Sequence, residues 1–88
     1  MAKKLTDIMK PGDWLIHQTR HGNWVVGQAT RVEENGDICT AVAAYNGYAE
    51  CKYCRTRQEA LDYAKSALGL VPTWHIGYHR YKLEPERQ

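Results

Sequence analysis

Hydrophobic and polar residues alternate along residues 14–54, a pattern typical of antiparallel strands with one buried face. The alternation predicts four strands, at residues 14–19, 24–32, 38–45 and 48–54. Turn residues separate them, at His21-Gly22-Asn23, Asn35-Gly36 and Asn46-Gly47. Asn-Gly is the strongest short hairpin signal, because both central residues of a type I′ turn need a positive φ. The pattern therefore predicts a meander of three hairpins, with a bulge or bend at Gly27.

After residue 56 the spacing of apolar residues changes to that of a helix. Leu61, Ala64 and Leu68 recur at helical intervals. Thr56 and Glu59 fit a capping box, in which the threonine side chain and the glutamate carboxylate bind free backbone amides at the start of the helix. Gly69 provides the stop. The sequence therefore predicts one well-capped helix between residues 56 and 69.

The remaining segments complete a small α+β domain. A last strand is predicted at residues 74–83, with 1–10 as an N-terminal turn and 84–88 as a frayed tail. A chain of 88 residues is one domain, 1–88, with a thin core. We expect a small twisted antiparallel sheet with one α-helix packed on it, in the order β-β-β-β-α-β.

Residues 10–45 carry a fold-level resemblance. The Lys10-Pro11-Gly12-Asp13 turn, the first strand, a bent second strand and an Asn-Gly hairpin resemble the opening of SH3-like small barrels. The resemblance implies a partial barrel as the architecture, and it implies no function. The helix before the last strand departs from the simplest barrels, so an open sheet covered by a helix is an equal alternative.

Charge and cysteine content narrow the setting. The net charge of +2 neither demands nor excludes a nucleic-acid partner. Three cysteines is an odd number, and the first ten residues lack the apolar core of a signal peptide. We therefore expect reduced thiols and a cytoplasmic location. No stretch approaches the roughly 20 apolar residues of a membrane span, so no membrane partner is expected.

Four residues match the ligand types of a structural zinc site. Cys51-x2-Cys54 supplies two thiolates, and His75-x3-His79 supplies two imidazoles. On one straight strand, however, His75 and His79 would lie about 13 Å apart, too far to bind one ion together. Ordinary strand cysteines and surface histidines are the favoured interpretation. We expect no cofactor and keep zinc as an alternative; a redox role for the cysteine pair lacks the βαβ context of such enzymes.

The last predicted strand is rich in aromatic and basic residues. Its candidate binding residues are Trp74, Tyr78, His79, Arg80, Tyr81 and Lys82. In a straight strand the even-numbered residues of this set share one face and the odd-numbered ones share the other. If the strand paired with residues 48–54, Lys52, Arg55 and Arg57 would lie beside it. Rings next to cations suit single-stranded nucleic acid; the alternative is that Trp74 and Tyr78 are core residues.

The turn between the first two strands offers a second candidate surface. Arg20 and Trp24 could form a protein-binding patch there, since tryptophan and arginine are favoured at binding hot spots. The alternative is that Trp24 is a core residue. An uncovered sheet edge would also permit a homodimer.

No catalytic motif is present in the sequence, and a thin core leaves little room for a deep pocket. We therefore expect a small interaction or regulatory module that binds a protein partner and is not an enzyme. Its size is typical of bacterial or phage inhibitors and accessories of larger machines. A nucleic-acid-binding domain is the first alternative, and a zinc-stabilised module is the second.

Overall fold

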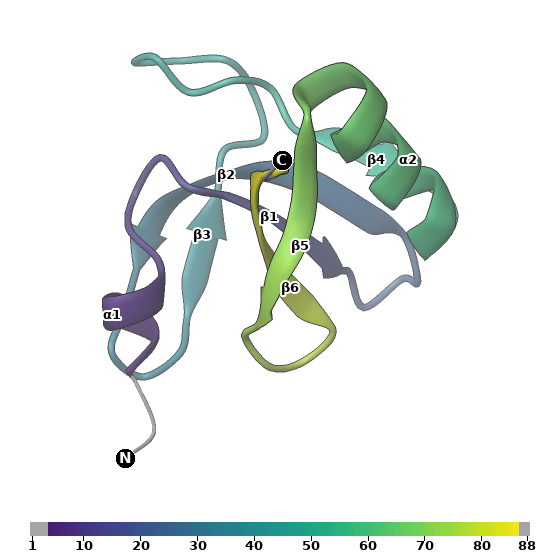
Figure 1. Ribbon diagram of the computed structural model, residues 1–88. Coiled ribbons are helices and arrows are strands. Elements are labelled where there is room, and N and C mark those ends of the chain that lie inside the picture. Colours follow the sequence, from purple (N-terminus) through teal and green to yellow (C-terminus); the bar gives the residue numbers. More distant parts are fainter. Residues whose placement is uncertain (1–3, 87–88) are drawn as a thin grey trace.

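A computed structural model describes residues 4–86 of the chain (Figure 1). The elements are α1 (Leu5–Ile8), β1 (Trp14–Gln18), β2 (Trp24–Val32), β3 (Ile38–Thr40), β4 (Lys52–Cys54), α2 (Arg57–Leu68), β5 (Leu70–His75) and β6 (Arg80–Pro85). Within the described range, six antiparallel strands form one sheet. The α+β class is confirmed, but the predicted order is wrong, because two strands follow α2. Neither described helix is long and apolar enough to cross a bilayer.

The predicted last strand, residues 74–83, is in fact a hairpin. Residues 76–79 form a tight turn between β5 and β6. A hydrogen bond of 2.9 Å, donated by the Ile76 amide to the Arg80 carbonyl, closes the turn. The sequence concealed this turn because two of its left-handed residues are Tyr78 and His79, which are uncommon with positive φ. β6 then continues to Pro85, so the predicted frayed tail is wrong at Glu84 and Pro85. Residues 87 and 88 lie outside the described range.

β2 is the strand around which the sheet is built. The main strand order is β3-β2-β1-β6-β5, and β4 pairs with β2 as well. The first residues of β2 pair with β4 and its last residues with β3, on the edge away from β1. The predicted third hairpin is therefore wrong: β3 stops at Thr40, and only an isolated bridge joins Tyr45 to Tyr48. The SH3-like barrel is not confirmed and stays a prediction.

The two Asn-Gly pairs make different turns. Asn46 and Gly47 both have positive φ, 47° and 86°, as a type I′ turn requires. In the β2–β3 turn only Gly36 has a positive φ, 101°, and the Asn35 side chain instead accepts the Asp37 amide. The β2–β3 turn is therefore not of the type I′ form predicted for it.

The larger core lies between the sheet and α2. Every second strand residue points to this side, and the buried set comprises Ile16, Trp24, Val26, Cys54, Leu70 and Leu83 with Ala60 and Ala64 of the helix. The two alanines are fully buried, so the helix backbone lies close to the strands. The Thr56 cap and the Gly69 stop are confirmed: the Glu59 amide donates to Thr56 Oγ1 at 3.1 Å, and Gly69 has φ 69°. The carboxylate half of the predicted capping box is shifted by one residue. The Glu59 carboxylate accepts the amide of Arg55.

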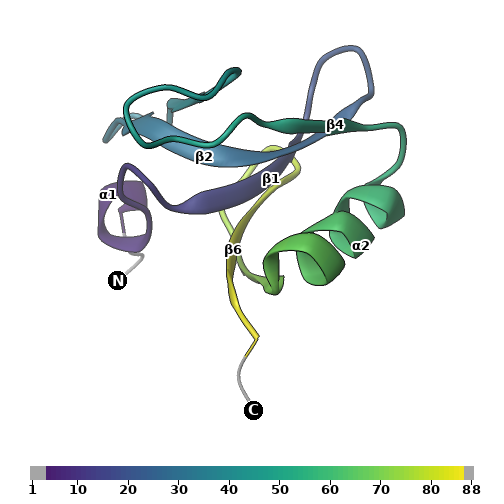
Figure 2. The same ribbon diagram turned by 90° about the horizontal axis from the view of Figure 1, so that it is seen from above.

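A smaller core lies on the opposite face of the sheet. Met9, Leu15 and Ala29 are buried there. At its border, α1, the end of β2, β3 and the β5–β6 turn add Leu5, Ile8, Val32, Ile38 and Ile76. Figure 2 shows α2 beside one end of the β1–β2 pair and α1 beside the other, with β6 crossing β1 steeply. The predicted N-terminal turn at residues 1–10 thus contains a four-residue helix; residues 1–3 lie outside the described range.

Gly27 is explained by close packing and not by the predicted bulge. The register shift of β2 lies between Ala29 and Arg31 instead. A Cβ atom added at Gly27 would stand 2.7 Å from Thr40 Cγ2 and 3.0 Å from Cys51 Cβ. The end of β3 and the residue before β4 therefore both press on β2 at the one position without a side chain.

We expect Gly27→Ala to destabilise the protein by about 1–3 kcal/mol, because the new methyl group overpacks this contact. Urea denaturation followed by tryptophan fluorescence measures the change. Thr40→Ser removes the nearest atom, so Gly27→Ala/Thr40→Ser should recover part of the loss relative to Thr40→Ser alone. Equal stability of Gly27→Ala and the wild type would contradict the close approach.

Candidate functional site

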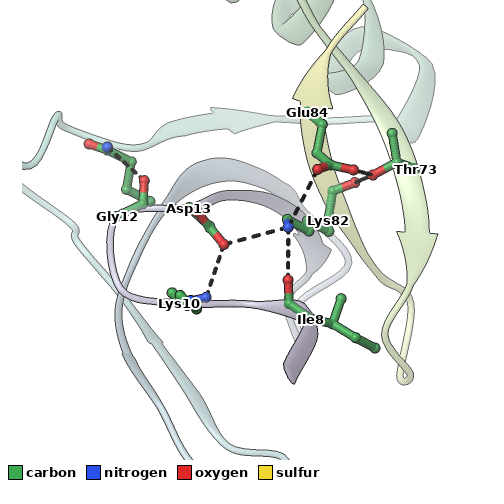
Figure 3. A network of polar contacts seen from close by, with 8 residues as sticks. Ile8, Lys10, Gly12, Asp13, Thr73, Lys82 and Glu84 are labelled. Carbon is green, nitrogen blue, oxygen red and sulfur yellow. Dashed lines mark hydrogen bonds and ion pairs between the residues drawn. The ribbon is translucent and has the colours of Figure 1, made fainter. Parts of the chain in front are cut away.

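Lys82, predicted to bind a partner, is instead held inside the protein. Its Nζ donates to the Ile8 carbonyl at 2.8 Å and lies 3.5 Å from Glu84 and 3.7 Å from Asp13 (Figure 3). Its side chain is only 15% exposed. Lys82 therefore joins the end of α1 to β6 and is not available to a ligand.

Arg80 is also held by hydrogen bonds within the protein. Its guanidinium donates to three backbone carbonyls: Nε to Gly77 at 3.1 Å, Nη2 to Ile76 at 3.1 Å and Nη1 to Gly36 at 2.8 Å. The first two close the β5–β6 turn, and the third ties the β2–β3 turn to it. Burial, with the charge of Arg80 adding to it, lowers the pKa of His17, the β1 residue that pairs with Arg80. This imidazole is therefore neutral at pH 7.

We expect Arg80→Lys to lower the free energy of unfolding by about 1.5–3 kcal/mol, since an ammonium cannot reproduce the guanidinium fork. Thermal and urea denaturation report the loss. Arg20→Lys is the matched control: Arg20 is exposed on the β1–β2 turn, and a change of less than about 0.5 kcal/mol is expected there. Unchanged stability of Arg80→Lys would restore Arg80 as a candidate ligand contact.

The β5–β6 turn carries backbone strain. Gly77, Tyr78 and His79 have φ values of 92°, 51° and 59° in succession. The left-handed region is unfavourable for residues with a Cβ, and such strain is concentrated at functional sites. Tyr78 is 88% exposed at the tip, where its ring lies 5.6 Å from the Arg80 guanidinium. The turn thus presents one aromatic ring to solvent on a backbone that Arg80 holds in place.

We expect His79→Gly to stabilise the protein by about 0.5–1 kcal/mol, because glycine takes a positive φ without a steric penalty. His21→Gly is the matched control, since His21 is an exposed turn residue without a positive φ. It should destabilise by about 0.5–1 kcal/mol through chain entropy alone. Denaturation midpoints compare the two; changes of the same sign would contradict strain at His79.

Three segments meet at one end of the sheet, which we call the loop end: residues 18–24, 54–58 and 75–81. Pairing of Trp24 with Gln18 and with Cys54 joins the first two segments. The backbone amide of Gln18 donates to the His79 carbonyl at 3.3 Å, which joins the first segment to the third. In Figure 1 the β5–β6 turn lies at the bottom centre, and the β1–β2 turn and the start of α2 lie to its right, nearer to mid-height.

An aromatic cluster of the loop end links the start of α2 to β6. The rings of His75 and Tyr81 lie 5.0 Å apart, and the Arg57 guanidinium lies 4.9 Å from the Tyr81 ring. His75 and Tyr81 share one face of the hairpin, while Trp74 pairs with Lys82 on the other. The even-numbered Trp74 and Lys82 and the odd-numbered His75 and Tyr81 therefore lie on opposite faces, as predicted for a straight strand. Tyr78 and His79 belong to neither face, because they are in the turn. The sequence placed Arg57 beside this strand only through pairing with residues 48–54, whereas its contact with Tyr81 crosses from α2 to β6.

The other predicted binding residues are separated. β4 pairs with β2, so Lys52 lies opposite Val26 and neither Lys52 nor Arg55 belongs to a strand beside β6. The Lys52 ammonium lies 5.7 Å from the Tyr63 ring of α2. Trp24 is 9% exposed and belongs to the larger core, whereas Arg20 is exposed on the turn. The predicted patch of Arg20 and Trp24 is therefore reduced to Arg20.

The second exposed surface is a loop that we call the arm, residues 41–50. Val42 is 66% and Tyr45 50% exposed. The Tyr45 and Tyr48 rings lie 5.6 Å apart across the Asn46-Gly47 turn. In Figure 1 the arm stands away from the sheet at the top. It was missed because its apolar residues resemble a strand; the signal that could have revealed it is the absence of charge from residue 38 to residue 49.

Gln28 anchors the arm at its base. The side-chain oxygen of Gln28 accepts the Ala49 amide at 2.6 Å, and its side-chain nitrogen donates to the Gly12 carbonyl at 3.0 Å. The backbone carbonyl of Gln28 accepts the Ala41 amide at 3.0 Å. Both ends of the arm are therefore fixed to the middle of β2, so its exposed residues lie on a defined support.

The four candidate zinc ligands do not come together. Cys51 and Cys54 are buried beside β2, whereas His75 and His79 are exposed on the β5–β6 hairpin. Between residues 4 and 86, no three histidine, cysteine or acidic side chains are grouped as metal ligands. Burial, and secondarily the nearby Glu59, raises the pKa of the Cys54 thiol. That direction is opposite to the activation that a redox cysteine requires.

A surface hollow of about 530 Å³ lies near the chain end, lined by Val71, Thr73, Glu84, Pro85 and Glu86. Its polar groups are carboxylates and one hydroxyl, without a histidine to act as a base.

Comparisons with protein-family models, with curated proteins and with solved structures found no match to this chain. The candidate surfaces are therefore judged by their geometry and chemistry.

Proposed function

We propose that this chain is a small, non-enzymatic interaction module that binds a protein partner through the arm. The observation that carries the proposal is an exposed, apolar loop on a fixed base, uncharged from residue 41 to residue 49. The centres of protein interfaces are depleted of charge and enriched in aromatic residues. The arm has both properties, with Val42 and Tyr45 exposed and no charged residue from 38 to 49.

The support of the arm favours recognition over a merely mobile loop. Two hydrogen bonds between the backbones of Tyr45 and Tyr48, at 2.7 and 3.2 Å, close its turn. The side chain of Gln28 holds its outgoing end. A loop ordered before binding loses less conformational entropy when it docks, so its apolar contacts contribute more to affinity. A module of this kind fits an inhibitor or accessory of a larger bacterial or phage assembly.

The proposal includes a cytoplasmic location. Cys39, Cys51 and Cys54 are all free thiols, as a reducing compartment would keep them.

The proposal also favours a different protein as the partner over a homodimer formed by sheet edges. The outer strand β5 contains Pro72, which has no amide hydrogen, and β3 and β4 have only three residues each.

The test compares the wild type with Val42→Ser/Tyr45→Ser. Each immobilised protein is used to capture partners from cells in which it occurs, and the captured protein is then purified and titrated by calorimetry. We expect one-to-one binding with a negative heat-capacity change and a loss of at least about tenfold in affinity in the double variant.

Tyr78→Ser is the matched control, because Tyr78 is also an exposed tyrosine on a turn but lies at the loop end. It should leave the affinity unchanged. Equal affinity of the arm variant and the wild type would contradict the proposal. Sedimentation of the free protein checks the alternative partner: dimerisation that is lost in the arm variant would identify a second copy of the chain as the occupant.

A further inference from the structure

The loop end has an unusual distribution of charge. None of the chain's ten acidic residues lies in residues 18–24, 54–58 or 75–81, whereas four arginines and three histidines do: Arg20, Arg55, Arg57, Arg80, His21, His75 and His79. The weak net charge of +2 therefore conceals a local concentration of arginines. Such a concentration creates a positive potential even on a nearly neutral protein.

Three of these arginines remain available. Arg80 is engaged with backbone carbonyls. Arg20, Arg55 and Arg57 are exposed, and none of them takes part in an ion pair formed by the described residues. The nearest acidic residue in the sequence, Glu59, uses its carboxylate to accept the Arg55 amide. Exposed arginines that form no ion pair within the described residues suit a negatively charged ligand, although Glu59 borders this end.

Aromatic rings lie among these cations. Tyr81 is half-buried, and its ring lies 5.0 Å from the His75 ring and 4.9 Å from the Arg57 guanidinium, so it helps to hold Arg57 in place. Tyr78 is 88% exposed on the strained turn of the same hairpin. Tyr81 thus helps to position a cation, and Tyr78 is the ring that projects into solvent from the adjoining turn. Flat rings of this kind stack on bases, and the arginines beside them can contact phosphates.

We propose that the loop end binds single-stranded nucleic acid, with a base stacking on Tyr78 and phosphates contacting Arg20, Arg55 and Arg57. This site lies outside the arm and goes beyond the proposed protein-binding function. A duplex is disfavoured, because its bases already stack on one another and would leave Tyr78 without a partner. An acidic protein segment would use the arginines but would offer no ring face to Tyr78.

The test uses the whole protein and fluorescein-labelled oligothymidine and oligouridine of about 15 nucleotides, a length within the usual site sizes for single strands. Fluorescence anisotropy gives the affinity between about 50 and 200 mM salt. Three phosphate contacts predict a slope of about −2 for log affinity against log salt. Arg20→Ala/Arg55→Ala/Arg57→Ala should lose at least about tenfold in affinity and most of that slope.

The matched control, Lys10→Ala/Arg31→Ala/Lys65→Ala, removes the same number of exposed cations from outside the loop end. It should keep the salt slope and an affinity within about threefold of the wild type. Tyr78→Gly, which suits the positive φ of residue 78, should fold normally and bind about tenfold more weakly. Circular dichroism confirms the fold of each variant.

Three results would each overturn the proposal. The first is the absence of salt-dependent binding at 50 mM salt. The second is an equal loss of affinity in the two triple variants, since net charge alone would then explain binding. The third is binding of a duplex or of polyglutamate as tightly as of the single strand, because the Tyr78 ring would then contribute nothing. None of these measurements involves the arm, so they are independent of the protein-binding test.

Discussion

Two cations of β6, Arg80 and Lys82, hold together the face of the sheet that α2 does not cover. The core on that face is small, with Met9, Leu15 and Ala29 as the buried residues of its hydrophobic cluster. α1 has four residues and is too short to be stable on its own. Lys82 binds the last carbonyl of α1, and Arg80 binds the Gly36 carbonyl of the β2–β3 turn. Charge-assisted hydrogen bonds thus provide cohesion where apolar area is scarce.

The same arrangement accounts for the location of the candidate surfaces. Because Arg80 and Lys82 serve the fold, the exposed cations at the loop end come from turns and from the start of α2. Because β3 and β4 share one edge of β2, the chain between them must leave the sheet, and this forms the arm. The interaction surfaces are therefore loops supported by a compact sheet, a common division of roles in binding proteins.

Local signals in the sequence predicted local structure well. Thr56, Glu59 and Gly69 define α2 because capping depends on residues three or four positions apart. The β5–β6 turn was missed because Tyr78 and His79 have the positive φ usually taken by glycine or asparagine, so the apolar–polar alternation ran through it without a break. The pairing of β4 with β2 was missed because no local pattern specifies a distant partner strand.

The candidate site was harder to predict for the same reason. Arg80 and Lys82 have the residue types of a nucleic-acid site, but their partners lie 44 and 74 residues away in the sequence. Arg57 entered the candidate site only because α2 brings it to Tyr81. A residue's type shows what it can bind, and only the fold shows whether the protein already occupies it.

Both polar atoms of the Gln28 side-chain amide form hydrogen bonds. Its oxygen binds Ala49 of the arm, and its nitrogen binds Gly12 beside α1. An amide group is planar and rigid, so these two contacts cannot move independently. A displacement of the arm must either break one hydrogen bond or shift the Pro11-Gly12 turn with it. Gln28 thus links the arm mechanically to the N-terminal segment, and amide hydrogen exchange at Ala49 would respond to changes near α1.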